Sequence, residues 1–256
     1  MSVTRFIKSS VTVAEMEARK IRHDSTELWT RAIQPALWLL IFGETFNAIR
    51  TMPTGNFSYM QFITPGILAQ SVLFISIFYG ITVVWERDVG IITKLLSTPS
   101  PRSSIVLGKS LAASLRGVFQ AIMIFALALL LGVKIRFDLP DILGVFAVVV
   151  LFAMCFSSLS MLLASYMKTR DRMMGIGQAL TMPLFFASNA IYPISIMPTW
   201  LQYVSIANPL SYVVDAIRSM LLEGTYQNLP VDILALLVFT TIFVTLASRT
   251  IKKLLE

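Results

Sequence analysis

One stretch of the sequence decides the fold: ILGVFAVVVLFAMCFSSLSMLLASYM, residues 142–167. It contains no charged side chain and is longer than the roughly 20 predominantly apolar residues that a transmembrane helix requires. We therefore expect it to cross a membrane as an α-helix. Four small residues share one face of this helix, Ala153, Ser157, Ser160 and Ala164, a pattern typical of close packing against a neighbouring helix.

Five further apolar segments surround this one, and together they predict an all-α, polytopic membrane protein. The expected spans lie at about residues 32–49, 62–84, 111–133, 142–167, 173–191 and 233–248. The composition agrees, because 56% of the 256 residues are hydrophobic and 14% are charged, whereas a soluble domain carries about 25% charged residues. So few charges could not cover the surface of a soluble globule of this size, which argues against an ordinary soluble enzyme.

The basic residues reveal the expected orientation. Most of the 21 Lys and Arg residues fall in the N-terminal segment, in the loops after the second and fourth spans, and at the C-terminus. Lys and Arg gather on the cytoplasmic side of membrane proteins, so we expect a multi-pass protein of the cell (inner, cytoplasmic) membrane with both termini in the cytoplasm. The net charge of +7 then reports orientation, and nucleic acid is not an expected partner.

Catalytic and metal-binding chemistry finds no support in the sequence. Cys155 is the single cysteine and His23 the single histidine, so no disulfide framework and no Cys/His metal site is expected. The spans carry no nucleophile–base constellation, which disfavours an intramembrane enzyme. Gly108-Lys109-Ser110 resembles the end of a phosphate-binding loop, but Ser103 stands where that motif requires glycine.

Residues 1–30 form a segment distinct from the six-span permease domain at 31–256. The apolar residues Val3, Ile7, Val11, Ala14, Ala18 and Ile21 recur at helical spacing, with basic residues between them. This pattern predicts an amphipathic helix on the cytoplasmic membrane surface, in contact with lipid headgroups. Packing against another protein domain is an equally good interpretation for part of it.

The loop at residues 85–109 combines charged and apolar residues in an unusual order. Glu86, Arg87 and Asp88 stand at the membrane exit, and Ile91, Ile92, Leu95 and Leu96 follow at helical spacing before Pro99 and Pro101. Proline ends a helix, so this loop predicts a short amphipathic helix. Such a helix suits docking into a groove on a partner, and the alternative is a solvated turn with an interfacial helix.

The long connection at residues 192–232 is apolar for a loop. Asn208-Pro209 is a strong helix start, with Asn at the N-cap and Pro at the first helical position, and Gly224 suits the C-cap. Apolar residues mark one face of this helix, while Asp215 and Arg218 stand at i,i+3 on the other. We expect short helices in the outer leaflet, buried in protein or lining a cavity.

Several of these motifs resemble the type-2 permeases of ATP-binding-cassette (ABC) exporters, especially the drug-resistance and nodulation-factor branch. They are ERDVG at 86–90, LLSTPSPR at 95–102, LGK at 107–109 and NPLSYVVDAIR at 208–218. Ile91 stands where the family often has Thr, and Pro101 replaces a commoner small or apolar residue.

The resemblance implies a homodimer of permease subunits bound to two copies of an ABC ATPase. ATP and Mg would be held by the ATPase, and this chain would hold no cofactor. The loop would be the coupling helix, which contacts the ATPase through Glu86, Arg87, Asp88, Gly90, Lys94, Leu95, Leu96, Pro99 and Arg102. An outer gate would include Trp200, Asn208, Pro209, Tyr212, Asp215 and Arg218.

Two spans carry polar and aromatic side chains at helical spacing. The second has Gln70, Phe74 and Phe78, and the fifth has Gln178, Thr181, Phe185 and Ser188. These stripes could line a path for an amphiphile or, equally, hold neighbouring helices together. Glu44 and Arg116 are the charged residues within spans, and we expect them to reach opposite membrane interfaces, as Lys109 does at the mouth of the third span.

The leading hypothesis is a permease subunit of an ATP-driven exporter that moves a lipophilic or amphiphilic compound out of the cytoplasm or the inner leaflet. An alternative cargo is a lipid-linked polysaccharide or glycolipid. An alternative class is an ion-coupled secondary transporter, which would need titratable groups near the midplane. Glu44 alone offers such a group, and it lies off-centre.

Overall fold

The computed structural model describes residues 3–23, 26–49, 55, 57–98 and 100–255. Within these ranges the chain is helical and contains no strand. The α-helices are α1 (Val3–His23), α2 (Thr26–Ile49), α3 (Tyr59–Asp88), α4 (Ile91–Leu96), α5 (Arg102–Leu130), α6 (Leu139–Ala164), α7 (Arg170–Phe186), α8 (Thr199–Ala207), α9 (Pro209–Arg218) and α10 (Leu229–Thr250). Short turns of other helix types are η1 (Ile194–Ile196), η2 (Ser219–Glu223) and η3 (Ile251–Leu255).

Four of the described helices are long and apolar enough to cross a membrane. They are α3, α5, α6 and α10, the last continued into η3. The predicted spans at 32–49 and 173–191 correspond to α2 and α7, which do not reach this standard; α7 has 17 residues and contains Pro183. The all-helical fold is therefore confirmed, whereas the count of six spans stays a prediction.

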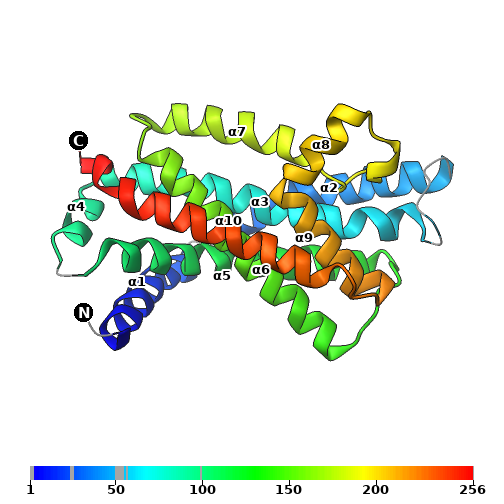
Figure 1. The fold of residues 1–256 in the computed structure, drawn as a ribbon, viewed down its shortest axis with the longest axis horizontal. Coiled ribbons are helices and arrows are strands. Elements are labelled where there is room, and N and C mark those ends of the chain that lie inside the picture. Colours follow the sequence, from blue (N-terminus) through cyan, green and yellow to red (C-terminus); the bar gives the residue numbers. More distant parts are fainter. Residues whose placement is uncertain (1–2, 24–25, 50–54, 56, 99, 256) are drawn as a thin grey trace.

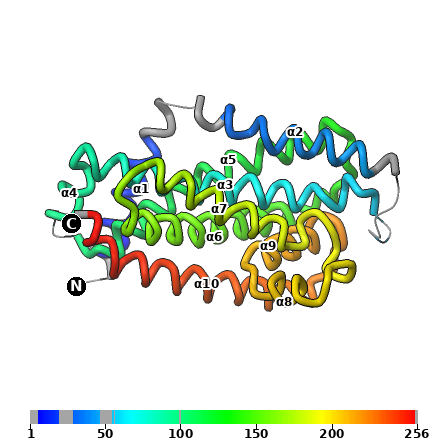
Figure 2. Tube along the Cα trace, turned by 90° about the horizontal axis from the view of Figure 1, so that it is seen from above, coloured from blue at the N-terminus to red at the C-terminus, as the bar shows by residue number. Residues whose placement is uncertain are grey.

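The helices lie side by side in a long bundle, with α3 at its centre (Figures 1 and 2). Helix α3 packs against α2, α5, α6, α7 and α9. In the most apolar 18-residue stretch of α3, 78% of the residues are buried, whereas in the corresponding stretch of α10 only 17% are buried. Large apolar side chains of α10, such as Leu234, Leu237 and Val238, remain exposed. Helix α10 thus offers its surface to lipid or to another subunit.

Close packing of α6 on α3 follows the predicted stripe of small residues. Ala153, Ser157, Ser160 and Ala164 are all fully buried. The hydroxyl of Ser160 donates to the carbonyl of Ile77 and accepts from the backbone N–H of Gly80 at 2.8 Å. The interpretation of this stripe as a helix-packing surface is therefore confirmed.

The amphipathic N-terminal helix packs on its own chain. Helix α1 lies against the first turns of α5, and the contact requires glycine, since a Cβ at Gly108 would lie 2.6 Å from the carbonyl oxygen of Ser10. The face buried in this way holds Val13 and Glu17, while Ile7 and Val11 of the predicted apolar face are exposed. The side chains of Val3 and Ile21 lie outside the described residues.

The two ends of the bundle carry different elements. One end, called here the α4 end, holds α4 together with α1 and the C-terminus (Figure 1). The opposite end, called the α9 end, holds α8 and the turn between α9 and α10. The candidate sites lie at these two ends and in the bundle between them.

Candidate functional site

The predicted docking helix is shorter than expected. Helix α3 continues through the charged residues to Asp88, and α4 begins at Ile91, so the charged residues and the apolar residues of the loop belong to two different helices. The break occurs at Gly90, whose φ of 77° lies in the left-handed region that residues with a Cβ disfavour. Pro101, in extended conformation, is the N-cap of α5. The result is a tight α3–α4–α5 hairpin.

The predicted docking residues differ in exposure. Asp88, Lys94 and Arg102 are exposed, and Gly90, Leu95 and Leu96 are half-buried. The Arg87 guanidinium donates to the carbonyls of Met167 at 2.7 Å and Lys168 at 2.8 Å, so it fastens α3 to the end of α6. Glu86 is fully buried and does not belong to the surface that a partner could contact. Pro99 lies outside the described residues.

Beneath this hairpin lies a buried ionic cluster, called here the Lys109 clasp, formed by Lys109, Glu17 and Glu86. All three side chains are fully buried. The Lys109 ammonium donates to Glu17 Oε1 at 2.7 Å and to the Glu86 carboxylate. The three residues come from α5, α1 and α3, so the clasp joins these helices at the base of the α4 hairpin.

Lys109 and Arg116 are buried within the protein, so neither extends its charge to the molecular surface as the expected interfacial side chains would. Because α5 begins at Arg102 instead of residue 111, Lys109 lies inside a continuous helix covered by α1, where two carboxylates compensate its charge. Arg116 is also buried, with its guanidinium 5.1 Å from the ring centroid of Tyr79. Glu44, in contrast, is exposed on α2.

A cavity of about 300 Å³ lies between α2, α3 and α7, and it brings together residues that both predicted stripes contribute. Its lining consists of Thr30, Arg31, Gln34, Pro35, Gln70, Phe74, Phe78 and Gln178. Phe74 and Phe78 stack with centroids 5.8 Å apart, and the Arg31 guanidinium lies 5.6 Å from the Phe78 centroid. We call this the α2–α3–α7 cavity.

Gln70 is the most informative residue of this cavity. Its side chain is 1% exposed, and its Oε1 accepts no hydrogen bond from any described residue. A buried acceptor left without a donor costs about 1–3 kcal/mol. A ligand that presents an N–H or O–H group beside the phenylalanine rings would satisfy this oxygen. The cavity therefore suits an amphiphile.

The remaining residues of the fifth-span stripe take part in helix packing. The Thr181 hydroxyl donates to the carbonyl of Gly177 at 2.8 Å, and that of Ser188 donates to Phe185 at 2.7 Å. The Phe185 ring meets Trp38 edge-on at 5.6 Å. The stripe thus divides, with Gln178 on the cavity and the others within the bundle. Sequence reasoning missed the contribution of α2, although Arg31 and Gln34 stand one turn apart at the start of its apolar run.

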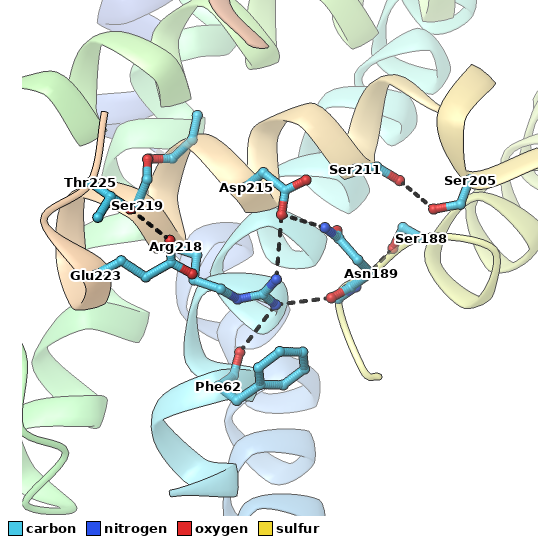
Figure 3. Close-up of polar contacts among 12 residues, drawn as sticks. Phe62, Ser188, Asn189, Ser205, Ser211, Asp215, Arg218, Ser219, Glu223 and Thr225 are labelled. Atoms are coloured by element: carbon cyan, nitrogen blue, oxygen red, sulfur yellow. Dashed lines mark hydrogen bonds and ion pairs between the residues drawn. The ribbon is translucent and has the colours of Figure 1, made fainter. Parts of the chain in front are cut away.

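At the α9 end a second polar network surrounds Arg218 (Figure 3). The Arg218 side chain is 7% exposed and donates to the carbonyl oxygens of Asn189 at 2.9 Å and Phe62 at 3.4 Å. Its guanidinium lies 3.9 Å from the Phe62 ring centroid and 3.4 Å from Asp215 Oδ1, which also accepts from Asn189. Asp215 and Arg218 form the predicted i,i+3 pair; the Arg218 side chain is buried, whereas that of Asp215 is partly exposed.

Burial alters the titration of this pair. It raises the pKa of Asp215, an effect that the positive charge of Arg218 opposes. Burial also lowers the pKa of Arg218 to about 10, and Asp215 acts in the opposite direction. Each charge thus opposes the effect of burial on the pKa of the other.

The other predicted gate residues lie on α8 and at the start of α9. The Asn208 side chain accepts from the N–H of Leu210 at 3.0 Å and caps α9, with Pro209 as its first residue. The Tyr212 hydroxyl donates to Ile206 at 2.7 Å, whereas Trp200 is exposed on α8. Gly224, at φ 66°, ends η2 as predicted. The helix start and stop are thus confirmed, and the gating role stays a prediction.

Comparison with known proteins agrees with this architecture. The family model described as ABC-2 type transporter matches residues 10–222. The chain is 30% identical over 189 residues to the putative transport permease ycf38 of Cyanophora paradoxa. The aligned region covers 73% of this chain and 64% of the relative. It thus spans just under two thirds of that protein's length.

Two bacterial relatives extend the comparison. The daunorubicin resistance ABC transporter permease protein DrrB1 of Streptomyces coeruleorubidus is 26% identical over 204 residues, covering 80% of this chain and 71% of its own length. The inner membrane transport permease YadH of Escherichia coli strain K12 is 28% identical over 207 residues, covering 77% of each protein. The chain belongs to the ABC-2 type transporter family.

Proposed function

We propose that this chain is the membrane permease subunit of an ATP-driven exporter and that it moves an amphiphilic compound, a drug or a lipid-like molecule, out of the cytoplasm or the inner leaflet. A separate ABC ATPase subunit, in two copies, binds ATP and Mg and hydrolyses the nucleotide. The observation that carries this proposal is the α2–α3–α7 cavity, where stacked phenylalanines adjoin a buried acceptor on Gln70.

We expect the cavity to load from the inner leaflet. The basic residues support a cytoplasmic α4 end, because Lys94, Arg102 and the C-terminal Lys252 and Lys253 lie there. Gln70 and Phe78 are eight residues apart on α3, so the cavity extends about 12 Å along the helix toward that end. An amphiphile could then place its apolar part against the phenylalanines and its polar part near Arg31.

The α4 hairpin is the proposed contact with the ATPase. Its exposed Asp88, Lys94 and Arg102 provide a mixed-charge surface around the half-buried Leu95 and Leu96. Helix α3 runs without interruption from this hairpin to the cavity, and Glu86 lies 16 residues, or about 24 Å, from Gln70. Movement of the hairpin when the ATPase subunits close would therefore be transmitted to the cavity through a rigid helix.

Assembly as a homodimer completes the proposal. The exposed apolar residues of α10 provide a surface that a second permease subunit or lipid must cover. Two copies of the chain would present two α4 hairpins, one for each ATPase subunit.

A glycolipid is a second candidate cargo, favoured by the side chains in the cavity. Gln34, Gln70 and Gln178 offer amide groups that can bind sugar hydroxyls, and Arg31 can bind a phosphate. The phenylalanine rings offer flat apolar faces to a sugar ring. Both cargoes share the same apolar and polar halves, so a competition experiment between them is informative.

The test uses the chain co-expressed with its ATPase and reconstituted in lipid nanodiscs. We expect the two proteins to co-purify and a fluorescent cationic or neutral amphiphile to stimulate ATP hydrolysis. Gln70→Leu should weaken this stimulation about tenfold, as expected for the loss of one hydrogen bond in a dry site. Gln120→Leu is the matched control, because Gln120 is also 1% exposed with an unpartnered Oε1 but does not line the cavity.

The outcomes separate the alternatives. A permease that purifies without an ATPase from the complete complex would contradict the proposed coupling. Equal effects of the two glutamine substitutions would contradict the proposed binding site. A glycolipid that competes with the amphiphile in the wild-type protein, but not in Gln178→Leu, would favour the second cargo.

A further inference from the structure

A second cavity lies at the α9 end, apart from the α2–α3–α7 cavity. It is enclosed by α9, the π-helical turn η2, the loop that follows and the first turn of α10. Its volume is about 200 Å³, and its lining is polar: Asp215, Ser219, Glu223, Thr225, Gln227, Asn228 and Asp232. Figure 3 labels four of these residues, Asp215, Ser219, Glu223 and Thr225. We call it the acidic cavity.

One carboxylate of the acidic cavity lacks a partner. Asp232 is 5% exposed, and its Oδ2 receives no hydrogen bond from any described residue. Its position in the first turn of α10 favours the charged form only weakly, which does not offset the cost of burying a carboxylate without a hydrogen-bond donor. The site therefore needs a donor that the described part of the chain does not supply.

The charges around the cavity do not balance. Of the three lining carboxylates, Asp215 is paired with Arg218. The guanidinium of Arg136 lies against Gly224 and pairs with Asp138 at 2.8 Å. Glu223 accepts from the Thr225 hydroxyl, a neutral donor. The cavity thus holds three carboxyl groups beside one guanidinium, that of Arg218, which acts on both Asp215 and Glu223.

The lining of the cavity suits a cation that carries hydrogen-bond donors. No group of three or more His, Cys, Asp or Glu side chains in the described part of the chain is close enough to ligate a metal. The volume instead admits a small organic cation. An ammonium group carries three donors and one charge, and it matches two carboxylates surrounded by hydroxyl and amide oxygens.

We propose that the acidic cavity binds the ammonium group of a primary amine, with Asp232 and Glu223 as its acceptors. The amine is either a free molecule or the ethanolamine headgroup of a lipid in the adjacent leaflet. This inference does not depend on the transport function, since it concerns binding at the α9 end. It predicts discrimination against quaternary ammonium groups, which are larger and have no N–H donor.

The test is calorimetric titration of the full chain, purified in a neutral detergent, with ethanolamine and with choline. We expect ethanolamine to bind at least about tenfold more tightly than choline, because choline has no N–H to donate to the carboxylates and forms no charge-assisted hydrogen bond. Asp232→Asn should weaken ethanolamine binding about tenfold or more. Asp138→Asn is the matched control, since Asp138 is an exposed aspartate at the same end and does not line the cavity.

A second variant and a lipid arm make the result decisive. Glu223→Gln, at an exposed position that should tolerate the change, also weakens ethanolamine binding if the proposal holds, even if Asp232→Asn fails to fold. In nanodiscs, phosphatidylethanolamine should prevent ethanolamine binding, and phosphatidylcholine should not, if the ligand is the lipid headgroup. If neither lipid prevents ethanolamine binding, the ligand is a free amine. Equal binding of choline and ethanolamine, or binding unchanged in both variants, would overturn the proposal.

Discussion

Replacing Lys109 with methionine tests the structural role of the Lys109 clasp. The substitution keeps most of the side-chain volume but removes the ammonium that pairs with Glu17 and Glu86, all of them fully buried. Removing one partner of a buried ion pair typically costs 3–5 kcal/mol, because the remaining charge is left uncompensated. Here two carboxylates, brought together from α1 and α3, lose the cation between them.

The expected change is large enough to measure by thermal unfolding in detergent. For a chain of this size, a loss of 3–5 kcal/mol should lower the midpoint by about 6–20 °C. The triple variant Glu17→Gln, Glu86→Gln, Lys109→Met removes every charge of the clasp and should recover most of this loss, since neutral replacements of whole buried pairs are often tolerated. Lys94→Met, the same change at an exposed position, should leave the midpoint within about 2 °C.

Two results would contradict the proposed structural role of the Lys109 clasp. A midpoint for Lys109→Met within about 2 °C of the wild type would mean that the clasp does not hold α1, α3 and α5 together. A triple variant as unstable as Lys109→Met would mean that lost packing, and not uncompensated charge, explains the effect.

Three further predictions follow from local geometry, each measured as a thermal midpoint and, for the first, as ATPase stimulation. Gly90→Ala should destabilise the hairpin by about 1–2 kcal/mol and weaken coupling to the ATPase, because φ is 77° at this residue; no atom obstructs the added Cβ, so the cost comes from the backbone alone. Gly175→Ala, on the open face of α7, should leave stability unchanged or raise it. Equal effects of the two substitutions would count against the importance of the backbone conformation at Gly90. Arg218→Lys should lower the free energy of unfolding by about 1–3 kcal/mol, because a lysine ammonium cannot contact Asn189, Phe62 and Asp215 together. Arg136→Lys, at an exposed position, should lower it far less. An Arg218→Lys protein as stable as the wild type would show that the planar guanidinium is not required. Gln70→Leu should leave the midpoint unchanged or raise it, because it removes an unsatisfied buried oxygen, and a fall of several degrees would indicate that Gln70 has a structural partner.

The sequence predicted those features that arise from local patterns. The cap at Asn208, the stop at Gly224 and the small-residue face around Ser160 depend on residues within a few turns of each other, and the structure contains all three. Hydropathy likewise located the segments that became α3, α5, α6 and α10. These features need no knowledge of the tertiary arrangement.

Features that depend on distant contacts were missed or misplaced. Glu17 and Lys109 are 92 positions apart, and helical periodicity does not indicate which face of α1 will pack against α5. Lys109 resembled a lysine at a membrane interface because its neighbours in sequence do not include the carboxylates that neutralise it. The α2 side of the α2–α3–α7 cavity was missed for the same reason, because Arg31 and Gln34 acquire meaning only beside Phe78 and Gln70.

We propose that ATP hydrolysis by the ABC ATPase subunit drives the export of an amphiphile through this permease. Its most direct test is the flux of a fluorescent amphiphile in inside-out vesicles that contain the chain and its ATPase, recorded with ATP, with a non-hydrolysable analogue and with a proton gradient alone. We expect flux with ATP only, reduced about tenfold in Gln70→Leu and kept in Gln120→Leu. Flux driven by the proton gradient without ATP would contradict it.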